Sequence, residues 1–141
     1  MRKRTKAREC ALQMLYQADM TDSPIDEIIE KYWQYKTRTP DVISFANDLF
    51  KGTYEHLEEI DKIISDYSEH WKISEMPVVD RNILRFAIYE IIYMDDIPPA
   101  ATIDEAVELA NRFSTPSSGK FVNGILDKVM LANSKKLNSR F

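Results

Sequence analysis

Apolar side chains recur every three or four residues along most of the chain. Between residues 5 and 19, Ala7, Ala11, Met14 and Leu15 would all lie on one face of a helix. No segment has the strict alternation of a half-buried strand, and no internal repeat is visible. The pattern therefore predicts an all-α fold, a compact single-domain bundle of about seven helices. The predicted helices cover residues 5–19, 25–33, 42–54, 57–67, 78–94, 102–113 and 121–129.

Several residues predict where these helices begin and which one is central. Ser23 is a predicted N-cap, with Pro24 at the first helical position. Thr102 and Glu105 have the spacing of a capping box, in which a hydroxyl and a carboxylate each satisfy a free backbone amide. Segment 78–94 is apolar on nearly all sides, so we expect a central helix that is covered by its neighbours.

Charge is distributed unevenly along the chain. The formal net charge is −4, yet every charged residue among residues 1–8 is basic. We interpret residues 1–8 as a basic N-terminal arm, residues 5–133 as an all-helical domain and residues 134–141 as a frayed tail. A cationic arm on an acidic body orients a polyanion toward one surface, whereas the alternative is a solvated, disordered start. The cations of the arm are Arg2, Lys3, Arg4, Lys6 and Arg8.

Cysteine use and hydropathy indicate a cellular compartment. Cys10 is the only cysteine, so no internal disulfide can form, which fits a reducing environment. No apolar run approaches the roughly 18 residues that a membrane span needs. No apolar stretch follows the basic start, as it would in a secretory signal. We expect a cytoplasmic protein in which Cys10 is a small buried hydrophobe of the first helix.

The sequence offers little for catalysis or cofactor binding. The only glycines are Gly52, Gly119 and Gly124, so neither a P-loop nor a dinucleotide fingerprint can be drawn. His56 and His70 lack the acidic or cysteine partners that a metal site requires. We therefore expect no catalytic residue, no metal and no cofactor, and a protein that is not an enzyme.

Cations and aromatic rings occur together at two places. Arg8 and Tyr16 are two helical turns apart and can point the same way from the first helix. Lys120 lies beside Phe121 where the last helix begins. Such pairs are typical of surfaces that bind single-stranded nucleic acid, because charge holds phosphates and rings stack on bases. Core packing is the alternative for both rings, and Phe121 taken alone fits the core better.

Beyond these patterns, a series of short runs stands in one order and spacing along nearly the whole chain. The runs are Ala7–Ala11 with Gln13 and Leu15–Gln17, Asp80–Arg81 with Ile83–Arg85, Tyr89–Glu90, Ile103–Ala110 and Lys120–Lys128. Together they resemble the NusB family of bacterial transcription antitermination factors.

The resemblance implies a compact all-helical RNA-binding protein that pairs with the ribosomal protein NusE. Together the two proteins would bind a single-stranded boxA element in nascent transcripts. The complex would load onto RNA polymerase with other Nus factors and suppress premature termination, notably of ribosomal RNA operons.

The resemblance also implies roles for particular residues. Asp80, near the start of the fifth helix, would face NusE. The loop 114–119 often carries an acid in relatives, but here it reads Ser-Thr-Pro-Ser-Ser-Gly. The implied RNA-binding residues are Arg2, Lys3, Arg4, Lys6, Arg8, Tyr16, Phe113, Lys120 and Phe121.

Three alternatives stay open on the sequence alone. The chain could be an RNA-binding module of ribosomal RNA maturation or ribosome assembly. It could be a structural homodimer whose basic arm has no role in RNA binding. A similar domain also occurs fused ahead of an RNA cytosine methyltransferase, but the sequence ends at Phe141 and we expect no catalytic domain here.

Overall fold

The computed structural model describes residues 2–69 and 71–138, and their side chains up to residue 133. Seven α-helices and one short 3-10 turn occur in the described part of the chain, which contains no strand. The predicted all-α class and number of helices are confirmed. The helices are α1 (Lys3–Met20), α2 (Ile25–Trp33), α3 (Pro40–Glu55), α4 (Leu57–Tyr67), α5 (Val78–Tyr93), α6 (Pro99–Phe113) and α7 (Ser118–Asn138), and the 3-10 turn is η1 (Ile73–Glu75).

The start of α6 differs from the prediction. The helix begins at Pro99, and Pro98 takes the N-cap position, because a proline fits the first helical turn, where no backbone amide is needed. Thr102 therefore lies inside the helix. Its buried hydroxyl donates a hydrogen bond of 2.9 Å to Glu90 on α5, so the predicted capping box does not form.

Three other helix ends also differ from the prediction. α1 begins at Lys3, so most cations of the predicted arm belong to a helix rather than to a disordered start. Pro24 is the N-cap of α2, which leaves Ser23 outside that helix. α7 continues through residues 134–138 of the predicted frayed tail. Residues 139–141 of that tail lie outside the described part of the chain.

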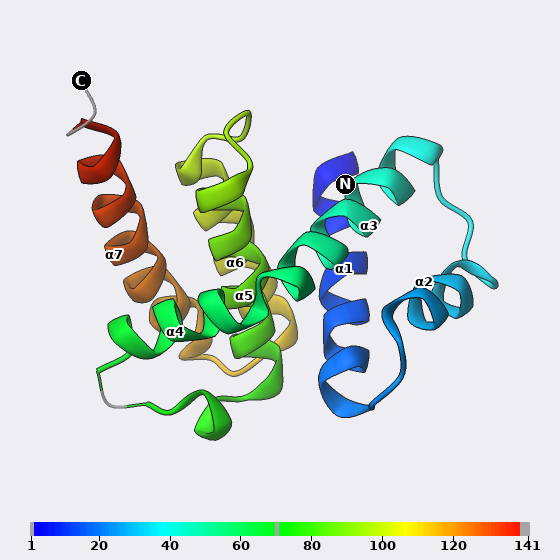
Figure 1. Ribbon diagram of the computed structural model, residues 1–141, viewed down its shortest axis with the longest axis horizontal. Coiled ribbons are helices and arrows are strands. Elements are labelled where there is room, and N and C mark those ends of the chain that lie inside the picture. The colour runs from blue at the N-terminus through cyan, green and yellow to red at the C-terminus, as the bar shows by residue number, and fades with distance from the viewer. Residues whose placement is uncertain (1, 70, 139–141) are drawn as a thin grey trace.

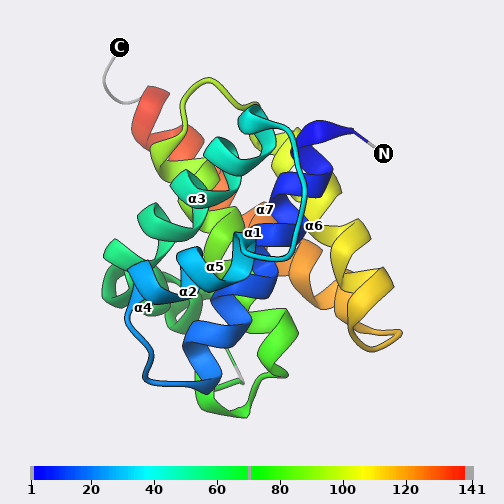
Figure 2. The same ribbon diagram turned by 90° about the vertical axis from the view of Figure 1, so that its right-hand side faces the viewer.

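α5 is the central helix, as its sequence predicts. It packs against α1, α3, α4, α6 and α7, and most of its residues are buried. In Figure 1, α1 to α3 lie on the right and α4 to α7 on the left, with α3 crossing in front of α1 and α4 crossing in front of α5. Figure 2 shows α1 between α2 and α3 on one side and α6 on the other. α1 and α3 therefore both contact the half that contains α5.

A buried ion pair attaches the beginning of α1 to the end of α5. The Arg8 guanidinium donates to both carboxylate oxygens of Glu90, at 2.8 Å from Nε and 2.7 Å from Nη2. Arg8 is 3% exposed and Glu90 is fully buried. Arg8 also lies 3.5 Å from Glu105 of α6, and Glu105 accepts a hydrogen bond from Thr5 at 2.6 Å. Three helices therefore meet at one charged cluster.

A second charged cluster attaches the other end of α1 to α5. Asp19 accepts hydrogen bonds from Arg81 at 2.7 Å, from Asn82 at 3.0 Å and from Arg85 at 3.1 Å. Arg85 in turn donates to Asp61 of α4 at 2.8 Å. Burial alone would raise the pKa of Asp19, but the hydrogen bonds from Arg81 and Asn82 and the charge of Arg85 outweigh it and lower the pKa. The two clusters hold α1 antiparallel to α5.

We predict that Glu90→Ala lowers the free energy of unfolding by about 3–5 kcal/mol. The substitution leaves the Arg8 charge buried without its main partner, which is far more costly than losing an exposed pair. Chemical denaturation measures the loss.

Asp66→Ala is the matched control, because Asp66 forms an exposed ion pair of 3.2 Å with Lys62 within α4. Its loss should cost less than about 1 kcal/mol. Equal losses for the two variants would show that the Arg8–Glu90 pair does not hold α1 in place.

Candidate nucleic-acid interface

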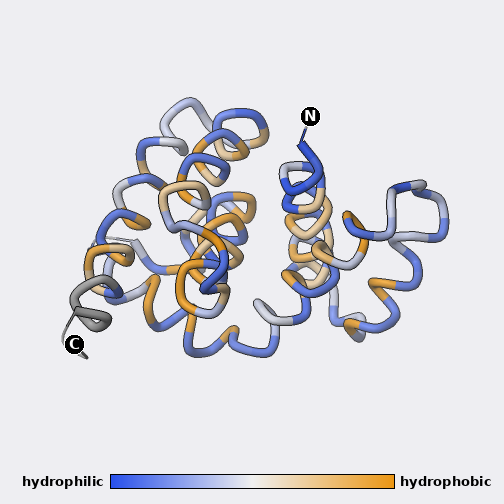
Figure 3. The backbone as a smooth tube through the Cα atoms, turned by 90° about the horizontal axis from the view of Figure 1, so that it is seen from above, coloured by the Kyte–Doolittle hydropathy of each residue, from blue (hydrophilic) through white to orange (hydrophobic). Residues whose placement is uncertain are grey.

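The outer face of α1 begins with a basic hollow. The hollow measures about 240 Å³ and lies between α1, the α2–α3 loop and α6. Its cations come from all three elements, and Glu9 is its only acid among the residues described. In Figure 3 the first turns of α1 are hydrophilic, and in its later turns hydrophilic and apolar residues alternate. The cations of the basic hollow are Lys6, Lys36, Arg38 and Arg112.

An aromatic groove of about 250 Å³ adjoins the basic hollow along α1. Tyr16 of α1 and Phe113 of α6 line it, and each is 41% exposed. The Arg112 guanidinium lies 4.7 Å from the centre of the Phe113 ring and 3.8 Å from the Glu9 carboxylate. Glu9 and Gln13 line both the hollow and the groove. Positive charge and exposed rings are therefore contiguous on one face. Leu12 and Val79 complete the lining of the groove.

The cations at the start of α1 have partners within the protein. Lys3 Nζ donates to Asp41 at 2.8 Å, and this hydrogen bond, together with one from Thr39, lowers the pKa of Asp41 to about 2. The Arg4 guanidinium lies 4.5 Å from the centre of the Phe45 ring. Lys6, in contrast, has no carboxylate within ion-pair distance among the described residues. Lys6 and Arg2 are therefore both free of ion pairs with the described residues, and Lys6 is the one that lines the basic hollow.

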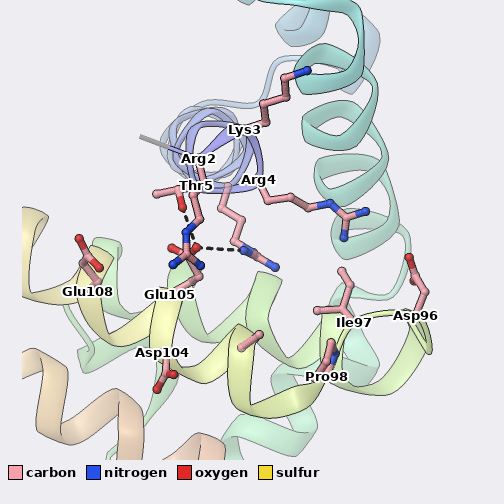
Figure 4. Close-up of a pocket in the computed structure, with 12 residues that line it drawn as sticks. Arg2, Lys3, Arg4, Thr5, Asp96, Ile97, Pro98, Asp104, Glu105 and Glu108 are labelled. Atoms are coloured by element: carbon pink, nitrogen blue, oxygen red, sulfur yellow. Dashed lines mark hydrogen bonds and ion pairs between the residues drawn. The ribbon is translucent and has the colours of Figure 1, made fainter.

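A larger groove of about 710 Å³ separates the start of α1 from α6. Figure 4 shows Arg2 and Arg4 on the α1 wall and Asp104, Glu105 and Glu108 on the α6 wall. The acidic wall repels a polyanion, so this groove is unsuited to one. The basic hollow on the other side of α1 is the better phosphate site.

Arg8 is not available for RNA, which corrects the prediction from sequence. It is buried and bonded to Glu90, and its neighbours Ala7 and Ala11 belong to the core. Arg8 stands in a run of basic residues, and such a run predicts an exposed side chain rather than a buried one. The only clue in the sequence is that Arg8 shares its helix face with the apolar Leu12 and Leu15.

Lys120 and Phe121 lie in the first turn of α7, and only one of the two is exposed. Lys120 is exposed, whereas Phe121 is half-buried and packs against the core. The ring of Phe121 meets Trp71 edge to face, with 6.2 Å between ring centres. Phe121 does not line the aromatic groove. The structure therefore brings Tyr16 and Phe113 together and leaves Phe121 with a different aromatic neighbour.

Asp80 is also placed differently from the prediction. It is 3% exposed, and its carboxylate accepts hydrogen bonds from Ser114 and, at 2.9 Å, from Ser118. Ser114 ends α6 and Ser118 begins α7. A buried carboxylate cannot be the exposed contact for a partner that the resemblance implied. Asp80 instead fixes the loop that separates Phe113 from Lys120.

The sequence did not identify four residues of this surface as site residues. Lys36 and Arg38 lie in a polar loop, and nothing in the sequence places that loop beside α1. Arg112 precedes a residue that was predicted, and Gln13 was noted only as part of a run. Alternating polar positions on the outer face of the first helix were the available signal for Gln13.

The fold and this surface define an all-α protein with cations and exposed aromatic rings side by side on one face. No described helix is long and apolar enough to cross a membrane, and no group of metal-ligating side chains occurs among the residues described.

The comparisons with known proteins agree with this class. The model of the NusB family matches residues 5–131. A transcription antitermination protein NusB from Thermodesulfovibrio yellowstonii is 48% identical, over 90% of this chain and 91% of that protein. The structure of T. maritima NusB is 38% identical with a TM-score of 0.84, over 92% of this chain and 91% of that one. A crystal structure of NusB and NusE in complex with double-stranded RNA contains a chain that is 31% identical, with a TM-score of 0.84 over 94% of this chain and 98% of that one. This chain belongs to the NusB family.

We predict that Asp80→Ala lowers the free energy of unfolding by about 1–3 kcal/mol, because the buried Ser118 hydroxyl loses its acceptor. The double variant Asp80→Ala/Ser118→Ala should recover part of the loss, since the buried Ser118 hydroxyl is then removed together with its acceptor. Urea denaturation measures both values.

Asp104→Ala is the control, an exposed carboxylate of α6 whose loss should change stability by no more than about 0.5 kcal/mol. If Asp80→Ala behaves like Asp104→Ala, Asp80 does not hold the α6–α7 loop.

Proposed function

We propose that this protein is a non-enzymatic RNA-binding transcription antitermination factor that acts with NusE. One observation carries the RNA-binding part, namely the contiguity of the basic hollow and the aromatic groove on the outer face of α1. A single strand needs both features side by side, because its phosphates and unpaired bases alternate along the chain.

The two parts of the surface have different roles in this proposal. The basic hollow binds phosphates, and each neutralised phosphate releases counterions, so binding weakens with salt. The aromatic groove stacks bases, and sequence-specific RNA readout favours unpaired bases of this kind. The residues of this surface that we propose to bind RNA are Lys6, Tyr16, Lys36, Arg38, Arg112 and Phe113. The resemblance to the family adds Arg2, Lys3, Arg4, Lys120 and Phe121, which lie outside the hollow and the groove.

The partner in the proposal comes from the family. The crystal structure of NusB and NusE with double-stranded RNA supports a NusB–NusE heterodimer that binds RNA. We extend this to boxA-type single-stranded RNA in nascent transcripts, and to delivery of the pair to RNA polymerase with other Nus factors. Suppression of premature termination in ribosomal RNA operons, in the bacterial cytoplasm, follows from that role.

The central test titrates a fluorescent boxA RNA with this protein, in the presence and absence of NusE, at several salt concentrations. We predict that Lys6→Ala/Lys36→Ala/Arg38→Ala weakens binding and reduces the salt slope by roughly 0.7 for each phosphate contact that is lost. The fold should survive, because all three side chains are exposed.

Lys51→Ala/Lys62→Ala/Lys128→Ala removes the same charge from outside the hollow and serves as the control. An equal effect of both triple variants would mean that net charge, rather than this surface, attracts RNA. A protein that binds no boxA RNA even with NusE is not the factor proposed here.

A further prediction separates stacking from packing. Tyr16→Ala and Phe113→Ala should each reduce RNA affinity by roughly 1–3 kcal/mol, with a smaller loss of stability than a core ring would cause, because each residue is 41% exposed in the groove. Phe121→Ala should lose stability as well, since its ring is half-buried against the core.

Tyr35→Ala is the control for loss of a surface ring, because Tyr35 is 89% exposed and lies outside the groove. Tyr16→Phe keeps the ring and should bind normally. Normal RNA binding by folded Tyr16→Ala and Phe113→Ala would contradict the stacking role.

A further inference from the structure

We propose that Gln13 reads the edge of one RNA base held in the aromatic groove, and that it favours a base with a keto oxygen, uracil or guanine, at that position. This inference rests on the proposed function. It adds a specificity-determining residue that neither the charge pattern nor the aromatic pattern of the chain identifies.

The groove suits a single base. Its volume of about 250 Å³ is below the range of drug-sized ligand sites. Tyr16 and Phe113 offer exposed ring surface, and the guanidinium of Arg112 lies over the Phe113 ring. The adjoining basic hollow supplies the charge complement for the phosphates on either side of that base. An unpaired base of a bound strand is therefore the occupant whose chemistry matches both parts of the surface.

The orientation of the Gln13 amide is fixed by its neighbours. Its Oε1 accepts hydrogen bonds from the Tyr32 hydroxyl at 2.5 Å and from Lys36 Nζ at 2.9 Å. An ammonium group can only donate, so the amide atom next to Lys36 must be the oxygen. The Lys36 ammonium is itself held 4.3 Å from the centre of the Tyr32 ring. The amide nitrogen of Gln13 consequently has a fixed position.

This amide nitrogen has no partner within the described part of the protein. Its two hydrogens bond to no described residue, although the side chain lines the groove. The Gln13 oxygen faces Tyr32 and Lys36, which line the basic hollow and not the groove. The amide nitrogen, on the other side of the amide group, is therefore left to donate toward the groove, which Gln13 also lines. A donor that is held in place in this way discriminates between an acceptor and another donor on the base edge.

Glu9 supplies the complementary acceptor. It lies one helical turn before Gln13 and lines the same groove, so the two side chains share one face of α1. Arg112 lies 3.8 Å from its carboxylate. A donor beside an acceptor matches a keto oxygen beside a ring N–H, as in uracil and guanine. In the same pose, cytosine and adenine would set an amino group against the Gln13 amide.

Gln13→Glu is the sharpest test of this inference. Glutamate keeps the oxygen that accepts from Tyr32 and Lys36, and it replaces the amide donor by a second acceptor. A purely structural role of Gln13 should therefore survive the change, whereas a base-reading role should not. Gln17→Glu introduces the same charge one turn later on the exposed face of α1, outside both cavities, and is the matched control.

The measurement uses a set of single-stranded boxA RNAs, each with one uracil changed to cytosine or one guanine changed to adenine. With NusE present, wild type should lose about tenfold in affinity at one position when its keto base is replaced. Gln13→Glu should abolish or reverse this preference at that position only. Gln13→Met, which has no donor and only a weak acceptor, should abolish the preference without reversing it. Gln17→Glu should weaken all RNAs equally.

The outcomes distinguish the inference from the function on which it rests. If Gln13→Glu and Gln17→Glu have the same effect at every position, Gln13 does not read a base, and RNA binding itself still stands. If wild type binds all RNAs of the set equally, the inference is overturned while the proposed function survives. If wild type binds none of them, with or without NusE, both are overturned.

Discussion

The buried pair of Arg8 and Glu90 is the interaction on which the rest of the structure depends. A guanidinium and a carboxylate have left water here, and each is satisfied only by the other and by the threonine and glutamate groups around them. Such a pair holds α1 in one position on α5, because moving either side chain away from the other would leave an unpaired charge in the low-dielectric interior. It fixes α1 on α5 and α6 at one end, and the Asp19 cluster fixes α1 at the other.

Fixing α1 at both ends determines which side of the helix faces outward. The side with Arg8 and Leu12 meets the core, so Lys6, Gln13 and Tyr16 are left on the surface. The α6–α7 loop is fixed separately by Asp80 and its serine partners, which sets Phe113 beside Tyr16. Buried polar contacts, rather than the cations themselves, thus position the proposed RNA-binding surface.

The charge of the surface also depends on this arrangement. The protein is acidic as a whole, and the acids of α6 face the first cations of α1 across one groove. The cations of the basic hollow come from three elements far apart in the sequence and gather on the opposite side of α1. An acidic body with one basic face orients a polyanion, whereas an even spread of the same charges would not.

The sequence by itself determined the helical class, the central position of α5 and membership of the NusB family, because apolar periodicity and ordered short runs are local properties of the chain. It also placed cations and rings on the elements that carry the surface. Only the tertiary structure decided which of them are exposed. Arg8 and Asp80 are charged residues that the fold buries with partners many residues away, and the loop of Lys36 and Arg38 is brought beside α1. Burial and pairing depend on contacts between distant segments, which no local pattern records.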